Sequence, residues 1–378
     1  MTILQLVSCR GWSSDAYWAA RVSVELERAG HEVTLVCRRG TGTRVIDRAR
    51  EAGVRRIETL ELSSGVKPAS DARDIAALMR ALERADVVHV HRGKEHWLAA
   101  AANRLSRTPR PLVRTRHIVQ AIRPHALNRW LYRAATALVV TVTEAIRRQY
   151  LAAGLLADER VVALPGGVDA LRFRPGADGA AWRRALGVGA DTALVGLVGG
   201  FRVMKGHRVA IAATASLLRA GRDVRLVFVG QGGLEAEIRG VIAAAGLGDR
   251  VSVTGFEPDV PAAMAALDVA LYPALESDGM SRVLFEYLAT GIPVVASRVG
   301  VVPEVLEDGE TALLVPAGEP DALAQAIGRM LDDRALAATI ASAGARLVQT
   351  RLSGARVAEV LAGHYARLRE PGAPGRDR

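Results

Sequence analysis

Short apolar runs that alternate with amphipathic segments of helical period constrain this chain most. In the first half we expect strands at 3–7, 33–36, 87–91, 112–115 and 137–141. The helices expected between them include 15–29, 94–105 and 144–152, and Thr143 caps the last of these. A further helix is expected to be capped by Asp71 and to run to about Arg84. A repeated strand–helix order of this kind predicts a parallel, doubly wound α/β sheet with helices on both faces.

A stretch rich in proline and glycine at 165–176 interrupts this pattern, and the pattern then starts again. In the second half the expected strands are 193–198, 224–229, 251–254, 268–271, 293–296 and 311–315. The expected helices are 205–219, 234–245, 281–289, 320–332, 334–349 and 353–368. Since 378 residues are long for one core, we expect a domain at 1–170, a second at 171–352, and a disordered tail at 369–378.

Composition limits the class of protein. Hydrophobic residues make up 50% of the chain, and no apolar run reaches the roughly 20 residues that a membrane span needs. The first residues read as a strand rather than a signal peptide, and Cys9 and Cys37 are too few for a disulfide framework. We therefore expect a cytoplasmic protein with reduced, buried thiols and no metal site.

The formal net charge of +10 is concentrated in one window. Residues 101–150 contain ten arginines and a single acid, Glu144, which gives a window charge of +9. This concentration favours an anionic acceptor or the inner surface of a membrane as partner, although a solvated surface is the simpler alternative. Nucleic acid is not expected, because no recognition motif is present and aromatic residues do not interleave with the arginines.

The window 276–297, ESDGMSRVLFEYLATGIPVVAS, carries most of the functional information. Asp278 and Glu286 stand eight positions apart, and a glycine-containing loop at 278–281 leads into an amphipathic helix. Gly291 and Pro293 end that helix before a buried strand. A helix start beside such a loop presents free N–H groups to phosphate, and the two carboxylates can accept hydrogen bonds from sugar hydroxyls.

This window resembles the signature of retaining GT-B glycosyltransferases with a Glu-x7-Glu motif, of the family 4 type found in bacterial surface-glycan synthesis. Glu286, the glycine of the helix stop and the Pro-Val-Val-Ala strand match that signature. Asp278 stands where the family has its first glutamate, and Glu276 is the nearby substitute. The resemblance implies that Glu286 binds the ribose and Asp278 the transferred sugar. It also implies donor contacts from Gly279, Met280, Ser281 and Val283.

The resemblance extends to the start of the second domain. Gly199 and Gly200 end a strand, and Arg202 and Lys205 follow, like the phosphate-binding segment of the family. Arg202 and Lys205 are therefore expected to neutralise the donor diphosphate, and Gly255 and Phe256 to lie beside the nucleobase. In this family two Rossmann-like domains face each other across a cleft. The last helix of the family usually crosses back onto the first domain, so the resemblance implies this path for the helix at 353–368.

In the first domain the resemblance implies roles at three strand ends. Gly11 follows the first strand and would approach the donor phosphates, whereas a simple tight turn is the alternative. His117 would lie near the donor sugar and counts with Asp278, Arg202 and Lys205 as a catalytic candidate. The acceptor-side candidates are His91, Arg92, Lys94, Arg114 and Arg116.

We therefore expect a metal-independent, retaining hexosyltransferase without a cofactor. Its donor is a UDP-, GDP- or ADP-linked sugar, and its acceptor is a glycan or lipid-linked hydroxyl compound, with lipopolysaccharide core synthesis the favoured setting. A nucleotide-sugar epimerase of the same fold and a non-catalytic sugar-nucleotide-binding module are the alternatives. An NAD-dependent Rossmann enzyme ranks low, because no Gly-x-Gly-x-x-Gly follows the first strand.

Overall fold

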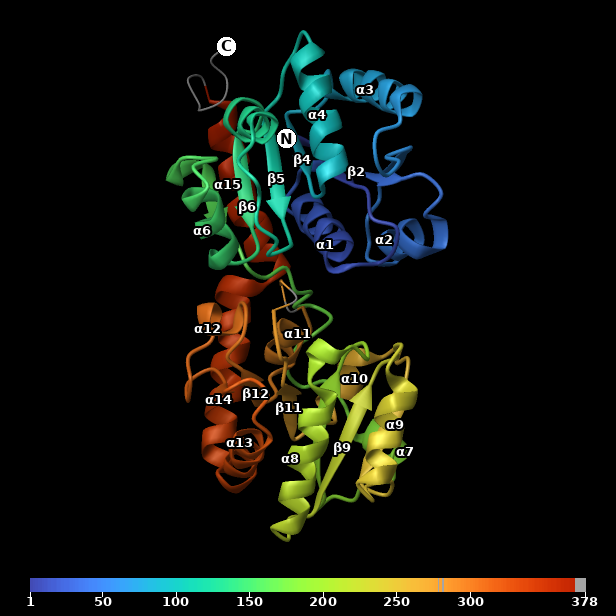
Figure 1. Cartoon of the computed structure of the whole chain (residues 1–378), viewed down its shortest axis with the longest axis vertical. Helices are drawn as coiled ribbons and strands as arrows, with labels where there is room; N and C mark the ends of the chain where they lie inside the picture. Colours follow the sequence, from blue (N-terminus) through green and yellow to red (C-terminus); the bar gives the residue numbers. More distant parts are fainter. Residues whose placement is uncertain (278, 281, 371–378) are drawn as a thin grey trace. The chain divides into compact units, whose positions relative to one another are not determined.

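A computed structural model describes residues 1–277, 279–280 and 282–370. The chain divides into two compact units (Figure 1). Unit 1 comprises Met1–Gly167 together with the chain from Ser353 onward, and unit 2 comprises Val168–Leu352. The expected tail beyond residue 370 lies outside the described residues.

Within its described residues, unit 1 has a seven-stranded parallel sheet in the order β3-β2-β1-β4-β5-β6-β7. Its strands are β1 (Thr2–Val7), β2 (Glu32–Arg38), β3 (Ile57–Leu60), β4 (Val87–Val90), β5 (Leu112–Arg116), β6 (Leu138–Thr141) and β7 (Val161–Ala163). Residue Leu4 pairs with Thr34 on one side and Val88 on the other. The first strand therefore lies inside the sheet, and the chain winds outward from it in both directions.

Helices cover this sheet and hold its ends. The α-helices are α1 (Ser14–Arg28), α2 (Asp47–Glu51), α3 (Pro68–Leu82), α4 (Gly93–Leu105), α5 (Ala126–Arg129), α6 (Glu144–Ala152) and α15 (Gly354–Arg369). Shorter turns are the π-helical η1 (Gly42–Ile46) and η2 (Trp130–Ala135) and the 3-10 turn η3 (Asp158–Arg160). Helix α15, from the far end of the sequence, packs on α1, and Tyr365 on it bonds to His89 of β4 at 2.5 Å.

Four histidines are buried in the described part of unit 1: His89, His91, His96 and His117. His89 also bonds to Thr115 at 2.6 Å, and His96 bonds to Thr136 at 2.8 Å. Burial lowers the pKa of His89 and of His117 to about 3, and it holds the pKa of His91 and of His96 well below the usual value. All four rings are therefore neutral in the folded protein near pH 7.

Unit 2 has a six-stranded parallel sheet within its described residues, in the order β10-β9-β8-β11-β12-β13. The strands are β8 (Ala193–Val198), β9 (Val224–Val229), β10 (Val251–Gly255), β11 (Val269–Tyr272), β12 (Val294–Ser297) and β13 (Leu313–Val315). The α-helices are α7 (Ala180–Ala185), α8 (His207–Arg219), α9 (Glu235–Ala244), α10 (Val260–Ala265), α11 (Arg282–Thr290), α12 (Val302–Val305), α13 (Pro320–Asp332) and α14 (Arg334–Leu347). The 3-10 turn η4 (Val203–Lys205) precedes α8, and the π-helical η5 (Val348–Leu352) follows α14.

The predicted α/β class with two parallel sheets is confirmed, and Thr143 caps α6 as predicted, accepting from the N–H of Ile146 at 3.2 Å. Two predicted helix starts are wrong. Asp71 does not cap α3, because Pro68 has the fixed φ of a first helical residue and starts the helix three positions earlier. Helix α8 does not start at Lys205, because Gly206 is left-handed (φ 73°) and separates η4 from the helix.

We expect acid to destabilise this fold through the four buried histidines. Their folded pKa values lie below the unfolded value of about 6.5, so the unfolded chain binds protons first as the pH falls. Their contribution is complete above pH 6.5 and is lost below it, at about 1.4 kcal/mol per pH unit for each histidine. Urea unfolding between pH 7.5 and 5 measures this slope.

The variant His96→Gln isolates one member of the set. Its slope below pH 6.5 should be smaller than that of the wild type by about 1.4 kcal/mol per pH unit. The exposed His125→Gln serves as the matched control and should keep the wild-type slope. An unchanged slope in His96→Gln would contradict the assignment of His96 as a buried neutral group.

Candidate functional site

In unit 2 the strand order reverses between β8 and β11, and the carboxyl ends of these two strands are therefore the expected ligand site. The chain runs from β8 outward through β9 to β10, and then returns to β11 on the other side of β8. The loops that leave two such neighbouring strands diverge, and ligands of open α/β sheets bind in the crevice between them. The loops in question are 199–206 after β8 and 273–281 after β11.

Glycines let the loops after β8, β9 and β10 touch through their backbones. The N–H of Gly199 donates to Val229 O at 2.9 Å, and the N–H of Gly230 donates to Gly255 O at 2.8 Å. A Cβ on Gly230 would lie 2.2 Å from the carbonyl oxygen of Gly199, so no other residue fits there. A Cβ on Gly232 would lie 2.6 Å from the backbone nitrogen of Phe201. The predicted glycine segment therefore lies at an edge of the sheet where neighbouring loops contact each other directly through their backbones.

Lys205 and Gly206 join the β8 loop to the β11 loop. A Cβ on Gly206 would lie 1.9 Å from Pro273 O, and the N–H of Leu275 donates to Met204 O at 2.9 Å. Lys205 is buried, with its ammonium 5.7 Å from the centre of the Tyr272 ring, an arrangement that stabilises a cation. The first N–H groups of α8 follow directly, so cation and helix dipole favour an anion at this point. Arg202, by contrast, is exposed on the same loop.

Glu286 lies on α11 at the same edge, and its side chain is buried. Its carboxylate pairs with Arg282 one turn earlier, at 3.2 Å. Burial raises the pKa of Glu286, while the charges of Arg282 and Arg172 oppose that shift. Helix α11 is fixed against β8 by Tyr287, whose hydroxyl accepts from the N–H of Val198 at 2.5 Å. The carboxylate is therefore held by a rigid helix beside Arg282, and it can accept a hydrogen bond from a ligand.

The first acid of the motif and one loop residue, Asp278 and Ser281, lie outside the described residues. Their neighbours are described. Gly279 is left-handed (φ 95°) and its N–H donates to Ser277 Oγ at 3.2 Å. Met280 is buried and Val283 is half-buried at the start of α11, whereas Glu276 is exposed. On the nucleobase side, Gly255 is left-handed and the Phe256 ring is 60% exposed.

In unit 1 the carboxyl ends of β1, β4 and β5 bring two predicted histidines together. His91 Nδ1 lies 3.2 Å from His117 Nε2, and His91 Nε2 lies 2.7 Å from Gln5 Oε1. With the amide oxygen of Gln5 as acceptor, His91 is protonated on Nε2 and its Nδ1 accepts from His117. His117 Nδ1 is then a hydrogen-bond acceptor, and it is buried without a hydrogen-bond partner among the described residues. Trp18 packs its ring edge against both histidines.

Two carboxylates hold the loops at this edge. Glu95, fully buried at the start of α4, accepts from the N–H of Ser8 at 3.2 Å and from that of Arg92 at 2.7 Å. Asp15, in the first turn of α1, pairs with Arg92 at 2.9 Å. Burial raises the pKa of Glu95, and the nearby charge of Arg114 opposes this shift. The end of β1 is thereby fastened to the end of β4.

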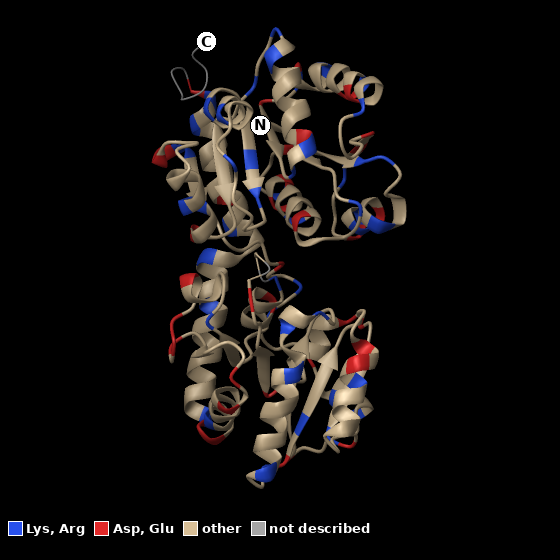
Figure 2. Cartoon of the chain, viewed as in Figure 1, with Lys and Arg blue, Asp and Glu red and all other residues tan. Residues whose placement is uncertain are grey.

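The remaining unit 1 candidates do not form one cluster. Lys94 pairs with Asp71 at 2.6 Å and donates to Gly65 O at 2.7 Å, so it fastens the start of α3. Arg114 and Arg116 alternate along β5 with Thr115, which faces His89, and therefore point to the opposite face of the sheet. Lysine and arginine positions, including those along β5, are blue in Figure 2. Gly11 has ordinary backbone geometry and free space at its Cβ, so sterics do not require glycine there.

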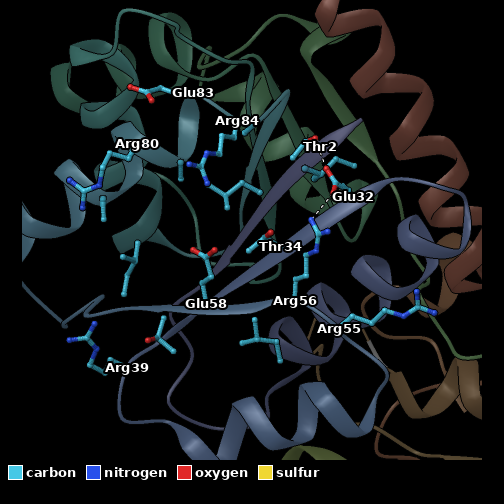
Figure 3. Close-up of a pocket in the computed structure, with 18 residues that line it drawn as sticks. Thr2, Glu32, Thr34, Arg39, Arg55, Arg56, Glu58, Arg80, Glu83 and Arg84 are labelled. Atoms are coloured by element: carbon cyan, nitrogen blue, oxygen red, sulfur yellow. Dashed lines mark hydrogen bonds and ion pairs between the residues drawn. The ribbon is translucent and has the colours of Figure 1, made fainter.

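A separate hollow of about 1090 Å³ lies over β1, β2 and β3 in unit 1. Threonines of the strands form part of its lining, and Figure 3 shows Glu32 bonded to Thr2 and to Arg56. Arg84 and Glu58 also line it. None of the predicted site residues lines this hollow, and its mixed charges do not indicate one class of ligand.

Sequence reasoning missed the residues that orient the candidates rather than contact a ligand. Gln5, Asp15 and Glu95 in unit 1 and Arg282 in unit 2 belong to this group. A polar residue inside an apolar strand, such as Gln5 in ILQLV, was the one available signal. Across residues 1–277, 279–280 and 282–370, no three His, Cys, Asp or Glu side chains gather as metal ligands. In the same ranges no helix is long and apolar enough to cross a membrane.

Comparison with known proteins places both units in one family. The family model for Glycosyltransferase Family 4 matches residues 17–172, and the family model for Glycosyl transferases group 1 matches residues 192–333. The chain is 34% identical to 2-deoxystreptamine glucosyltransferase of Streptomyces kanamyceticus over 249 residues, 64% of this chain and 63% of that enzyme. It is 31% identical to a D-inositol 3-phosphate glycosyltransferase of Saccharomonospora viridis over 310 residues, 74% of this chain and 69% of that enzyme.

The fold has matches among solved structures. The Anabaena protein Alr3699/HepE in complex with UDP superposes with a TM-score of 0.83 at 22% identity, over 97% of this chain and 100% of that one. The chain spans roughly three fifths of the length of the first curated relatives that it matches. The two family matches and the Saccharomonospora relative together decide the assignment. The chain belongs to glycosyltransferase family 4, the group 1 glycosyltransferases, and has their GT-B fold.

Proposed function

We propose that this chain is a retaining, metal-independent glycosyltransferase that moves a hexose from a nucleoside-diphosphate sugar to an acceptor hydroxyl. The observation that carries the proposal is the carboxyl edge of the unit 2 sheet, which carries the buried Lys205, the start of α8 and the buried Glu286 on α11. The assigned family consists of glycosyltransferases, and the two curated relatives above are named for glycosyl transfer.

We place the donor at this edge with its diphosphate toward α8 and its ribose toward α11. The diphosphate lies at Gly199, Gly200 and the start of α8, where Lys205 and Arg202 neutralise its charge. Glu286 then accepts from ribose hydroxyls, and the loop at 278–281 contacts the transferred sugar. Alr3699/HepE was crystallised with UDP and with UDP-glucose, which supports a nucleoside-diphosphate sugar as donor class.

Transfer forms a bond between the anomeric carbon and the acceptor oxygen and breaks the bond between that carbon and the phosphate oxygen. The acceptor proton passes to the departing phosphate, on the same face of the sugar, so the anomeric configuration is retained. Negative charge grows on the leaving diphosphate, and Lys205, Arg202 and the α8 dipole stabilise it in the transition state. His117, neutral because its pKa is about 3, accepts a hydrogen bond from the sugar through Nδ1.

The acceptor is a glycan or a lipid-linked sugar of cell-surface synthesis, handled by a cytoplasmic enzyme at the inner face of the membrane. The Arg-rich window supports an anionic acceptor. A lipopolysaccharide core mannosyltransferase of Rhizobium meliloti is 29% identical over 209 residues, which supports lipopolysaccharide core synthesis as the setting. A nucleotide-sugar epimerase shares the fold, with a TM-score of 0.68 at 17% identity to a putative UDP-N-acetylglucosamine 2-epimerase of Listeria monocytogenes. An epimerase would release nucleotide without an acceptor.

A thermal-shift panel of UDP-, GDP- and ADP-sugars, each with EDTA, tests the donor site. At a hundredfold excess over its dissociation constant, the correct donor should stabilise the fold by about 2.7 kcal/mol and raise the melting temperature by several degrees. Lys205→Met should abolish the shift, because it removes the buried cation that faces the diphosphate. Lys67→Met, on an exposed lysine of unit 1, is the matched control and should keep it.

A melting temperature that none of the three classes of nucleotide sugar raises would favour the non-catalytic or degenerate alternative. A shift that disappears with EDTA would contradict metal independence. A melting-temperature shift that persists in Lys205→Met would contradict the proposed position of the diphosphate at the start of α8.

The variant Glu286→Gln tests the ribose contact by steady-state kinetics with the donor found in that panel. Charge-assisted hydrogen bonds contribute about 1.5–3 kcal/mol each, so kcat/KM for the donor should fall roughly 10- to 100-fold. Asp191→Asn, an exposed acid elsewhere in unit 2, should keep wild-type kinetics. Equal kcat/KM values for Glu286→Gln and the wild type would contradict the ribose contact and leave Glu286 with a structural role. Nuclear magnetic resonance of the product identifies the retained anomer.

A further inference from the structure

The last helix of the chain brings a buried tyrosine into the interior of unit 1. Tyr365 lies on α15 (Figure 1), and its hydroxyl lies 2.5 Å from Nδ1 of His89 on β4. On the other side of the ring, His89 Nε2 lies 2.6 Å from Thr115 Oγ1. Gln5 of β1 is the register partner of His89, and all four side chains are buried. Helix α15 therefore contributes a polar group to the same part of unit 1 as the candidate histidines.

Gln5 connects this tyrosine to the two candidate histidines. Gln5 Oε1 lies 2.7 Å from His91 Nε2, and His91 Nδ1 lies 3.2 Å from His117 Nε2. Gln5 also interacts with the Tyr365 hydroxyl, and this interaction opposes the burial that raises the pKa of Tyr365. A group that lowers the pKa of a phenol donates to its oxygen, so the Gln5 amide nitrogen is turned toward Tyr365. This contact is looser than the others, because that nitrogen has no hydrogen bond of standard geometry among the described residues.

The six side chains form one series of polar contacts, which we call the six-residue network. A neutral imidazole or an amide donates on one side and accepts on the other, so the direction of one hydrogen bond sets the direction of the next. With the Gln5 amide as the structure has it, donation passes in one direction along His117, His91, Gln5, Tyr365, His89 and Thr115.

The direction of this network decides what His117 offers to a ligand. In the direction given above, each of the three rings is protonated on Nε2, and His117 Nδ1 is left as an acceptor. If the Gln5 amide were turned over, every hydrogen bond would reverse, and His117 Nδ1 would hold a proton and become a donor. His117 Nδ1 is the end of the network without a hydrogen-bond partner among the described residues. The network therefore has two possible states that differ at the atom facing the site.

We propose that Tyr365 is a positioning residue for His117, because its hydroxyl accepts from the Gln5 amide nitrogen and thereby holds the amide oxygen toward His91. Without that hydroxyl the amide can turn over, since either its oxygen or its nitrogen can pair with His91 Nε2. A hydroxyl of the donor sugar can donate only to an unprotonated Nδ1 of His117. This last step rests on the proposed function, whereas the tautomer of His117 does not.

Nitrogen NMR of the full chain labelled with 15N-histidine tests the tautomer without any ligand. At pH 7.5 the wild type should show His117 with an unprotonated Nδ1 and a protonated Nε2, and the variant His117→Gln assigns these signals. In Tyr365→Phe the two signals should move toward those of an imidazole that is protonated on Nδ1. Wild-type His117 with a protonated Nδ1, or an unchanged tautomer in Tyr365→Phe, overturns the proposal.

The matched control is Tyr150→Phe, which removes another buried hydroxyl of unit 1. The Tyr150 hydroxyl donates to that of Tyr132 at 3.3 Å and is not part of the six-residue network. This variant should keep the wild-type tautomer of His117. A tautomer change of equal size in Tyr150→Phe would mean that the loss of any buried hydroxyl loosens the cluster, which also overturns the proposal.

Binding of two ligands tests whether the tautomer acts on the sugar. The probes are the nucleotide sugar that the thermal-shift panel selects and the same nucleoside diphosphate without the sugar, each titrated by calorimetry. Tyr365→Phe should bind the nucleotide sugar roughly 2- to 12-fold more weakly, because one neutral hydrogen bond is lost, and should bind the nucleoside diphosphate as the wild type does. Equal weakening of both ligands, or no weakening of either, overturns the positioning role.

A double-mutant cycle tests the route through Gln5. Gln5→Leu should change the tautomer of His117 and weaken nucleotide-sugar binding about as much as Tyr365→Phe does. Adding Tyr365→Phe to Gln5→Leu should cause no further loss, because the hydroxyl acts through the amide. Losses that add would show that Tyr365 acts by another route and would overturn the proposal. Thermal melting followed by circular dichroism shows whether each variant is folded, and the NMR comparison of Tyr365→Phe decides if Gln5→Leu is not.

The outcomes separate this proposal from the proposed function. If no nucleotide sugar raises the melting temperature, the proposed function fails, and the NMR comparison alone decides on the role of Tyr365. If the donor binds while the tautomer of His117 is the same in Tyr365→Phe and the wild type, the proposed function stands and the positioning role fails.

Discussion

The candidate site of unit 2 depends on direct backbone contacts between the loops that follow its strands. Gly206 meets Pro273, Gly230 meets Gly199 and Gly232 meets Phe201 at distances that exclude a Cβ. These contacts fix the loops after β8, β9 and β11 without side chains between them, so amide groups and the start of α8 face the crevice. Any side chain at these glycines would separate the loops and move the start of α8 away from the proposed diphosphate site.

Two buried charges are held at that edge. Lys205 lies by the Tyr272 ring, and Glu286 pairs with Arg282. The pKa of Glu286 is raised because burial outweighs the charges of Arg282 and Arg172, so burying this carboxylate costs stability. Under the proposed function, ribose hydroxyls beside Glu286 would donate hydrogen bonds to it, and donor binding would then stabilise the fold.

Much of the fold could be predicted from hydrophobic periodicity, and the predictions that failed did so for physical reasons. The strand at 193–198 and the cap at Thr143 were predictable because their signals are local. Strand β3 was missed because it is four residues long and mostly half-buried, with no alternation. The glycine and lysine segment after β8 could be picked out as a site candidate from its own residues and the family resemblance, whereas the Gln5–His91–His117 contact could not be predicted. It joins residues up to 112 positions apart through neighbouring parallel strands, and no local pattern encodes that register.

The candidate residues of the two units differ in their electrostatics. In unit 2, Lys205 and the α8 dipole supply positive charge, as the proposed leaving diphosphate requires. In unit 1, burial keeps His91 and His117 neutral, with the pKa of His117 near 3. Burial of the histidine cluster makes the fold acid-sensitive, and it also keeps His117 an uncharged hydrogen-bond acceptor near pH 7. In the proposed reaction a neutral imidazole suits the donor sugar better than a cation would, because positive charge develops at the anomeric carbon as the phosphate leaves.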